Sequence, residues 1–260
     1  MENNSDKDTP LFSIRALCKK FPGESYISAL QDINLDIYNG ECLLIAGANG
    51  AGKTVLMKIL AGLLEPTEGE ITFMGKPLSE CKGQLRQSVG LMFQEPDLQI
   101  LGETVEEDIR FGPENLKLPE KEIEERLEET LSALELSQKR RFAARHLSGG
   151  EKRRLVVAGV LAMGCETIIM DEPFANLDWP GVVQVLKIIQ GLKNKSKTVI
   201  VLTHELEKVL ALADRLVIMA EGKIKYSGSP EEALSRLEPS WGVRDPRKKY
   251  SSAADCTWLE

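Results

Sequence analysis

The chain has 260 residues, a formal net charge of −7 and 42% hydrophobic residues. This length suffices for one large domain or two modest ones, and the apolar fraction is ordinary for a globular protein. The acidic balance argues against a nucleic-acid surface as the main partner. No apolar run approaches the roughly 20 residues that cross a bilayer, and the five scattered cysteines predict reduced thiols rather than a disulfide framework or a metal site.

The first 46 residues predict an opening set of β-strands. Residues 1–10 are polar and show no signal-peptide pattern, so we expect a frayed terminus. Apolar residues alternate over 12–21 and again over 30–38, which is the period of a half-buried strand. Asn39-Gly40 predicts a tight turn into a third strand at 42–46. We expect these opening strands to form an antiparallel β layer.

A glycine-rich turn separates the strand at 42–46 from a helix that begins at Lys53. A G-x-x-x-x-G-K-T pattern between a strand and a helix is typical of a phosphate-binding loop. The glycines let the backbone approach an anion, and the turn N–H groups with the helix N-terminus bind a triphosphate. Lys53 adds a charge at the β- and γ-phosphates, and the Thr54 hydroxyl is placed to ligate Mg²⁺. The loop residues are Gly47, Ala48, Asn49, Gly50, Ala51, Gly52, Lys53 and Thr54.

A glycine-rich turn without a ligand is the alternative, but such a turn does not need the Lys-Thr pair.

Two further short strands are expected at 70–74 and 89–93, and a helical insert then covers about 95–162. Its amphipathic segments predict helices because apolar residues recur on one face. These helices are expected at 104–110, 121–136 and 148–163.

Strands and helices alternate again after the insert, which predicts a parallel sheet. We therefore expect an α/β domain over 1–230, with its core at about 11–94 and 163–230, and a closing helix and tail over 231–260. The strands are expected at 167–170, 198–203 and 216–219. The helices are expected at 182–192, 205–212 and 230–237.

Two acids, Asp171 and Glu172, end the apolar strand at 167–170. An acid at the C-terminal tip of a parallel strand points into the ligand crevice. Asp171 could hold Mg²⁺ directly or through water, and Glu172 could orient or deprotonate an attacking water. Two solvated acids at a strand end are the alternative. The phosphate-binding loop in the same chain makes this alternative much less favoured.

A second anion-binding loop is predicted at Leu147-Ser148-Gly149-Gly150-Glu151. Ser148 is a plausible N-cap, and the two glycines expose N–H groups at the positive end of the following helix. One chain with two such loops but a single triphosphate cradle suggests that the second loop serves another subunit's nucleotide. A plain N-cap is the alternative.

These motifs, in this order, resemble the ATP-binding-cassette family of ATPases over about residues 11–230. GANGAGKT resembles the phosphate loop of that family, LSGGE its signature motif and IIMDEP its magnesium-and-base strand. ANLD at 175–178 resembles its inter-subunit loop, LMFQEPD around Gln94 its Q-loop, and His204 after VIVLT its switch histidine. The resemblance implies a P-loop NTPase (RecA-like) core with an antiparallel β layer and an inserted α-helical subdomain. It also implies ATP hydrolysis with ATP and Mg²⁺ as cofactors.

The resemblance assigns a role to each matched residue. Lys53 and Thr54 would hold phosphate and Mg²⁺, and Gln94 would sense Mg²⁺ and the γ-phosphate. Glu172 would be the catalytic base. His204 would bind the γ-phosphate and help to position the water, although a structural histidine is the alternative.

Other matched residues would act at the nucleotide base and between subunits. Ser148, Gly149 and Gly150 would close over the partner's ATP, and Asp178 would lie at the dimer seam. Phe21 stands where the family often stacks a Tyr on adenine, with simple core packing as the alternative. The departures from the family pattern are Asn176, Trp179 and Glu151, and none removes a catalytic group, so we predict a competent enzyme.

The segment QEPDLQIL at 94–101, with TVEEDIRFGPENL at 104–116, looks like the energy-coupling-factor and cobalt-type ATPases of micronutrient importers. In that family this region lies beside the groove for a membrane partner's coupling helix. The resemblance implies a peripheral protein on the cytoplasmic face of the membrane. It would energise import of a vitamin or transition metal ion through integral membrane subunits by ATP-driven closure of a dimer.

The second ATPase subunit could be an identical or a related chain, and the sequence does not identify the cargo. An ATPase of another importer or exporter type is the main alternative. A non-transport ATPase acting on nucleic acid or ribosomes is disfavoured, because such proteins usually carry two cassettes or a long coiled coil. We therefore expect no direct nucleic-acid partner.

Overall fold

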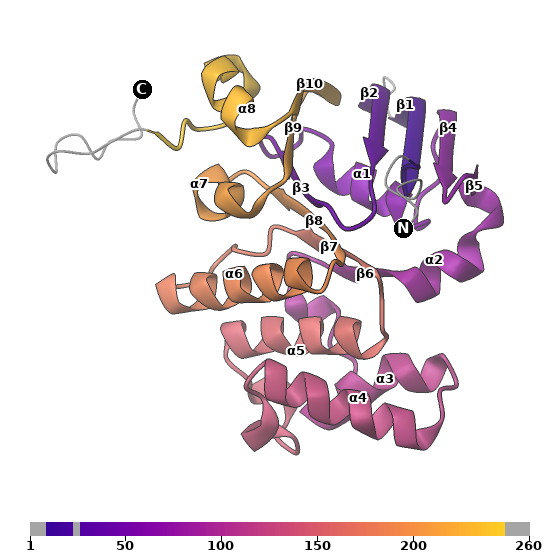
Figure 1. The fold of residues 1–260 in the computed structure, drawn as a ribbon, viewed down its shortest axis with the longest axis vertical. Helices are drawn as coiled ribbons and strands as arrows, with labels where there is room; N and C mark the ends of the chain where they lie inside the picture. Colours follow the sequence, from indigo (N-terminus) through magenta and orange to yellow (C-terminus); the bar gives the residue numbers. More distant parts are fainter. Residues whose placement is uncertain (1–8, 23–26, 248–260) are drawn as a thin grey trace, which may run out of the picture.

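The structure is a computed structural model that describes residues 9–22 and 27–247 (Figure 1). One of its two sheets has the strand order β2-β1-β4-β5, with antiparallel pairing throughout. This sheet is the antiparallel layer that the alternating pattern predicts. Its strands are β1 (Phe12–Phe21), β2 (Ile27–Ile37), β4 (Glu68–Phe73) and β5 (Lys76–Pro77).

The second sheet has the order β10-β9-β3-β8-β7-β6, and all of its neighbours run parallel except the β9–β10 hairpin. The third opening strand, β3, belongs here and not to the antiparallel layer, because it pairs in parallel with β8 and β9. The strands are β3 (Cys42–Ala46), β6 (Val89–Met92), β7 (Thr167–Asp171), β8 (Thr198–Thr203), β9 (Arg215–Ala220) and β10 (Lys223–Gly228).

Helices cover both faces of the parallel sheet, which explains why β3, β7 and β8 are buried along their whole length. Leu43 and Ile45 face a core shared with the antiparallel sheet and α1, whereas Leu44 faces a core shared with α5 and α6. The helices of this part are α1 (Lys53–Leu60), α2 (Lys82–Ser88), α6 (Trp179–Asn194), α7 (Leu206–Val209) and α8 (Pro230–Arg236).

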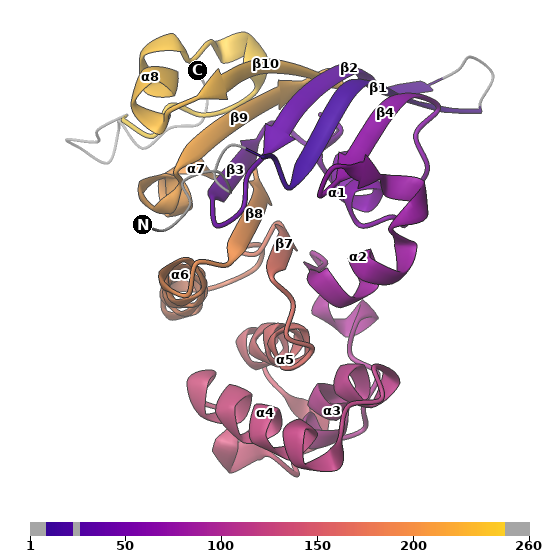
Figure 2. The ribbon, with the colours of Figure 1, turned by 45° about the vertical axis from the view of Figure 1, so that its right-hand side comes forward.

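Three helices pack against one another at the end of the molecule away from the antiparallel sheet (Figures 1 and 2). They are α3 (Val105–Asn115), α4 (Glu120–Ala133) and α5 (Gly149–Ala162). Backbone pairing joins the entry to α3 with the segment that leads into α5. The Ala144 N–H donates to the Glu103 carbonyl (2.9 Å), and the Val105 N–H donates to the Phe142 carbonyl (3.1 Å).

The structure adds elements for which the sequence carries only a weak signal. α2 buries a single leucine, Leu85, and so shows no helical period. β10 is a short hairpin strand with one buried residue. α3 continues past its predicted end at 110 and through Pro113, since it packs along α5. α6 begins at Trp179, three residues before its predicted start.

Cys18, Cys42, Cys81 and Cys165 are free thiols. Burial raises the pKa of Cys42 and of Cys165 to about 11, so both stay protonated near neutral pH and act as small apolar residues in the core. Cys256, the first eight residues and the end of the tail lie outside the described residues.

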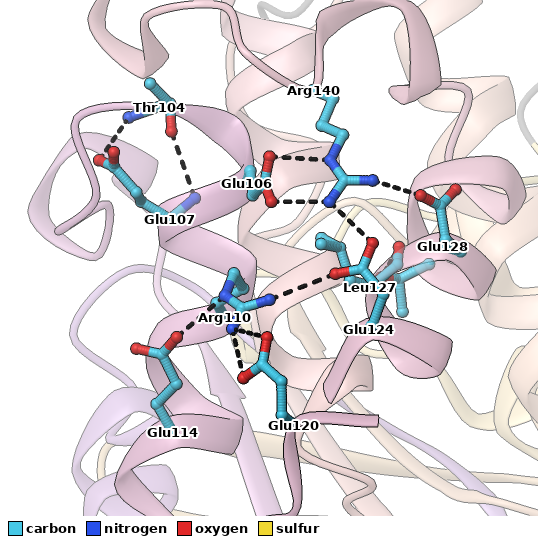
Figure 3. A network of polar contacts seen from close by, with 11 residues as sticks. Thr104, Glu106, Glu107, Arg110, Glu114, Glu120, Glu124, Leu127, Glu128 and Arg140 are labelled. Atoms are coloured by element: carbon cyan, nitrogen blue, oxygen red, sulfur yellow. Dashed lines mark hydrogen bonds and ion pairs between the residues drawn. The ribbon is translucent and has the colours of Figure 1, made fainter. Parts of the chain in front are cut away.

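Two arginines, Arg110 on α3 and Arg140, hold the three-helix region together (Figure 3). Arg110 donates to Glu120 (2.7 Å) and Glu124 (3.3 Å) of α4. Arg140, which follows α4, donates to both carboxylate oxygens of Glu106 on α3 (2.7 and 2.8 Å) and to Glu124 on α4 (2.8 Å). It also donates to Glu128. These hydrogen bonds raise the pKa of Arg140, because they stabilise its charged form.

Arg140→Met should therefore lower the melting temperature of the protein. The loss of a partly buried set of charge-assisted hydrogen bonds costs about 1–2 kcal/mol, which is roughly 2–8 °C for a chain of this size. Thermal denaturation followed by circular dichroism measures the shift. Lys121→Met is the control, because Lys121 is 88% exposed and forms a single 3.8 Å ion pair. Equal melting temperatures for the two variants would contradict the stabilising role of Arg140.

Candidate nucleotide-binding and hydrolysis site

Residues 47–52 form the turn between β3 and α1, and Lys53 and Thr54 are the first two residues of α1. Gly52 has φ +100° and is the N-cap of α1. A Cβ atom there would lie 2.6 Å from the Ala29 carbonyl oxygen, and one at Gly47 would lie 2.2 Å from that of Met219. Only glycine fits both positions, so the turn is packed tightly on its inner side. Gly50 has φ +82° and faces open space, which leaves the outer side of the turn accessible.

Lys53 directs its ammonium group into this turn. Its side chain is 6% exposed, and Nζ donates to the carbonyls of Gly47 (2.6 Å) and Ala48 (3.2 Å). Nζ also lies 3.5 Å from Oε1 of Glu172. A buried cation is thus held between the turn and the carboxylate at the end of β7.

Thr54 and Asp171 bring an oxygen pair together beside Lys53. The Thr54 hydroxyl donates to Oδ2 of Asp171 (2.8 Å). The other oxygen, Oδ1, is buried and has no hydrogen-bond partner among the described residues. Burial raises the pKa of Asp171, because the charged carboxylate loses its hydration. An unsatisfied buried carboxylate oxygen next to a hydroxyl fits a hard divalent cation such as Mg²⁺.

Glu172 follows β7 in an unusual backbone conformation, with φ +46°. Its N–H donates to the Leu202 carbonyl of β8 (2.8 Å), and its carboxylate accepts a hydrogen bond from the Thr203 hydroxyl (3.0 Å). Nδ1 of His204 lies 3.0 Å from Oε1 of the same carboxylate. The residue is 5% exposed, so these contacts fix the orientation of a buried carboxylate.

The structure thus gathers Lys53, Thr54, Asp171, Glu172 and His204 at one edge of the parallel sheet. Thr203 belongs to this group, and the sequence analysis missed it. A polar residue at the tip of an apolar strand is the same signal that identified Asp171.

Gln94 and Phe21 lie at the ends of two other strands. Gln94 comes two residues after β6, and its side chain is exposed. Its carbonyl accepts a hydrogen bond from Arg153 on α5 (3.4 Å). Phe21 ends β1, is half-buried, and has the Lys19 ammonium 5.2 Å from its ring centroid.

Ser148 and Asp178 each cap the N-terminus of a helix. The Ser148 hydroxyl accepts from the Glu151 N–H (3.4 Å), and the Glu151 carboxylate accepts from the Ser148 N–H (2.9 Å), which forms a capping box on α5. Asp178 accepts from the Gly181 N–H of α6 (2.9 Å). Within the described ranges no hydrogen bond or ion pair joins either cap to the phosphate-binding turn.

Gly149 and Gly150 follow the Ser148 cap. A Cβ atom on either glycine would meet no atom within 4 Å. The packing of this chain therefore does not require glycine at these positions.

A buried lysine in a strand–turn–helix unit, with two acids at the tip of another parallel strand of the same sheet, defines a P-loop ATPase core. Residues 30–175 match the family model described as ABC transporter. The chain is 42% identical over 214 residues to the energy-coupling factor transporter ATP-binding protein EcfA of Methanocaldococcus jannaschii, which covers 81% of this chain and 77% of that protein. It is 40% identical over 230 residues to the cobalt import ATP-binding protein CbiO of Rhodobacter capsulatus, which covers 87% and 81% of the two chains.

The solved structure of cbiO1 from Clostridium perfringens, part of the ABC transporter complex cbiONQ, has the same fold. Its TM-score is 0.79 at 33% identity, over 90% of this chain and 93% of that chain. The chain therefore belongs to the ABC transporter family, and it is an ATP-binding, ATP-hydrolysing subunit similar to the energy-coupling-factor and cobalt importer ATPases.

Proposed function

We propose that this ATPase energises the import of a micronutrient, a vitamin or a transition metal ion, through integral membrane partner subunits. The similarity to EcfA and CbiO supports this class of transport. An exposed apolar surface at the start of the helical region is the structural observation that carries the proposal. None of the helices in the described part of the chain has the length and apolar character needed to cross a membrane.

Leu98, Leu101 and Phe111 are the exposed large apolar residues of this region, which we call the docking surface. They are 75%, 64% and 48% exposed. Leu101 and Phe111 line a small groove together with Val156 and Val160 of α5. Exposed apolar side chains that gather at a groove mark an interaction site, and a groove between helices suits an amphipathic helix.

Polar contacts hold the backbone of the docking surface in place. The Asp108 carboxylate accepts from the N–H groups of Leu101 (2.7 Å) and Gly102 (3.0 Å). The Gln99 side chain accepts from the Phe93 N–H (2.6 Å) and donates to the Leu91 carbonyl (2.8 Å), which ties the loop to β6. The apolar side chains are thus presented on a fixed backbone, so docking need not order the loop first.

At the nucleotide site, Lys53 and the turn N–H groups would bind the phosphates, with Phe21 against the adenine. Thr54, Asp171 and Gln94 would hold Mg²⁺, which neutralises phosphate charge when bound. Glu172 would accept a proton from the attacking water. His204 would hold the γ-phosphate and help to place that water.

A second ATPase subunit, identical or related, would complete the site. Ser148, Gly149 and Gly150 would close over the partner's ATP, and Asp178 would lie at the seam. The open space at both glycines supports this arrangement, since a partner's nucleotide can approach the α5 N-terminus there. Trp179 supports it too, because it lies next to Asp178 and is 79% exposed.

Under this proposal the helical region at about 95–162 is the subdomain that meets the membrane partner. The protein would lie at the cytoplasmic face of the membrane. It would bind no nucleic acid directly, in line with its net charge of −7.

A charge within the docking surface should abolish membrane docking and spare ATP binding. Phe111→Asp places a carboxylate where an apolar contact is expected, so the membrane subunits should no longer co-purify in mild detergent. Leu63→Asp is the matched control, because Leu63 is similarly exposed (59%) but follows α1. ATP affinity should match the wild type in both variants. Retention of the membrane proteins by Phe111→Asp would refute the docking assignment.

The same pull-down tests the transport class. Two small integral membrane proteins with the wild-type chain, one coupling subunit and one binder, would support micronutrient import. One large multi-span permease would indicate another transporter type. Ribosomes or DNA without any membrane protein would contradict the transport proposal.

A further inference from the structure

Arg153, in the second turn of α5, is a buried residue of the site that the sequence analysis did not identify. It is 4% exposed. Its guanidinium donates to backbone carbonyls in two separate segments. It donates to Gln94 (3.4 Å) after β6, to Glu172 (3.4 Å) and Pro173 (3.2 Å) after β7, and to Ala175.

Carbonyl oxygens are the only hydrogen-bond acceptors that the described residues supply to this buried cation. Burial lowers the pKa of Arg153 from its ordinary value, because the charged guanidinium loses its hydration. The planar guanidinium carries five donors in a fixed fork, so it can span several carbonyls at once. A shift of either segment would leave donors of a buried charge unpaired, which is costly. The two segments and α5 are therefore fixed to one another.

This arrangement holds the backbone of Glu172 in place. Its φ of +46° is unfavourable for a residue with a side chain and persists only where the surroundings hold it. The Glu172 N–H is bonded to Leu202 on β8, and its carbonyl is bonded to Arg153 on α5. The direction of the carboxylate thus depends on contacts from two different elements.

We propose that Arg153 is a positioning residue that sets the orientation of Glu172 for hydrolysis and couples that orientation to helix α5. The inference rests on the proposed role of Glu172. Because α5 begins at the Ser148 cap, a shift of this helix on a partner's nucleotide moves Arg153, and with it the backbone of Glu172 and Ala175. One side chain of each subunit thereby links the two nucleotide sites of a dimer.

Steady-state ATPase kinetics of the full-length chain test this coupling. Arg153→Met removes the donors but keeps an unbranched side chain of similar reach. We expect kcat to fall roughly 10- to 100-fold, because small misplacements of a reacting group have effects of this order. KM should stay within about threefold, since the phosphate-binding turn is untouched. Arg153→Lys keeps the charge but cannot span the same carbonyls, so its kcat should lie between those of the wild type and Arg153→Met.

Hydrogen exchange of the nucleotide-free protein, followed by mass spectrometry, gives a readout that is independent of activity. Exchange should accelerate at 93–96 and 172–178 in Arg153→Met, where the Ala175 N–H is bonded to the Glu172 carbonyl (3.1 Å). Arg126→Met is the matched control. Arg126 also donates to a backbone carbonyl, that of Ala162 (2.8 Å), but it lies on α4.

Equal kcat for Arg153→Met and Arg126→Met would overturn the proposal. So would parallel losses of kcat and ATP affinity with faster exchange over the whole chain, because a purely structural role predicts that pattern. If Glu172→Gln keeps full activity, the proposed role of Glu172 fails, and with it the coupling to hydrolysis. The exchange data would then still decide whether Arg153 fixes the two segments.

Discussion

Glu172→Gln should lower the rate of ATP hydrolysis roughly 100- to 10,000-fold, the range that removal of a general base covers. Glutamine keeps the shape of the side chain, and its amide oxygen can still accept the hydrogen bond that Thr203 now donates to Glu172. The substitution therefore removes only the negative charge and the basicity of the carboxylate. Phosphate release under saturating ATP measures the effect.

ATP affinity should not fall in Glu172→Gln, so the variant should hold ATP without turnover and accumulate as a nucleotide-bound dimer in size-exclusion chromatography. Glu205→Gln is the control, because Glu205 is a neighbouring carboxylate that pairs with Lys208 (2.6 Å). Undiminished phosphate release by Glu172→Gln would rule out Glu172 as the base.

Lys53→Met should lower ATP affinity roughly 100-fold or more, which corresponds to about 3 kcal/mol and to the loss of charge-assisted hydrogen bonds to phosphate. Methionine keeps the unbranched stem, so the turn should retain its shape. Equilibrium binding of a fluorescent ATP analogue measures the change. Lys58→Met is the control, since Lys58 lies on the same helix but is exposed.

The structure adds a second expectation for Lys53→Met. Lys53 and Glu172 are both buried and lie 3.5 Å apart, so the variant leaves a buried carboxylate without its cation. The melting temperature should fall, and the added Glu172→Gln change should restore it without restoring ATP affinity. If the double variant is no more stable than Lys53→Met, the ion pair does not stabilise the protein.

The two strongest sequence patterns predicted their elements well, because both are local. The strand at 42–46 and the helix from Lys53 lie where the glycine-rich pattern predicts them, and Asp171 ends β7 with Glu172 directly after it. The alternating pattern predicted both ends of β1, Phe12 and Phe21, although a bulge between Ile14 and Leu17 shifts the buried face by one residue. Sheet membership was harder, as β3 shows, because it depends on partners far along the chain.

What the sequence could not predict is set by tertiary contacts. In the sequence Arg153 is one of several charged residues at the start of a helix. In the structure it shares a buried face of α5 with Val156 and Val157, which lie three and four residues later. The positive φ of Glu172 accompanies backbone hydrogen bonds to Leu202 and Arg153, two residues that are far from it in the sequence. Asp178 was predicted only as a dimer-seam residue, and the structure shows that it also caps α6. The N-cap role predicted for Ser148 is confirmed.

The backbone pairing of 103–105 with 142–144 closes a loop of about 40 residues that contains α3 and α4. Movement of the chain beside the docking surface must therefore carry the segment before Ser148 with it, without passing along α4. Helix α4 stiffens this loop, because Arg140 bonds to Glu124 on α4 and to Glu106 on α3. The three-helix region should thus move as one rigid unit. Insertions or deletions at the end of α4 should leave the coupled movement of 103–105 and 142–144 intact.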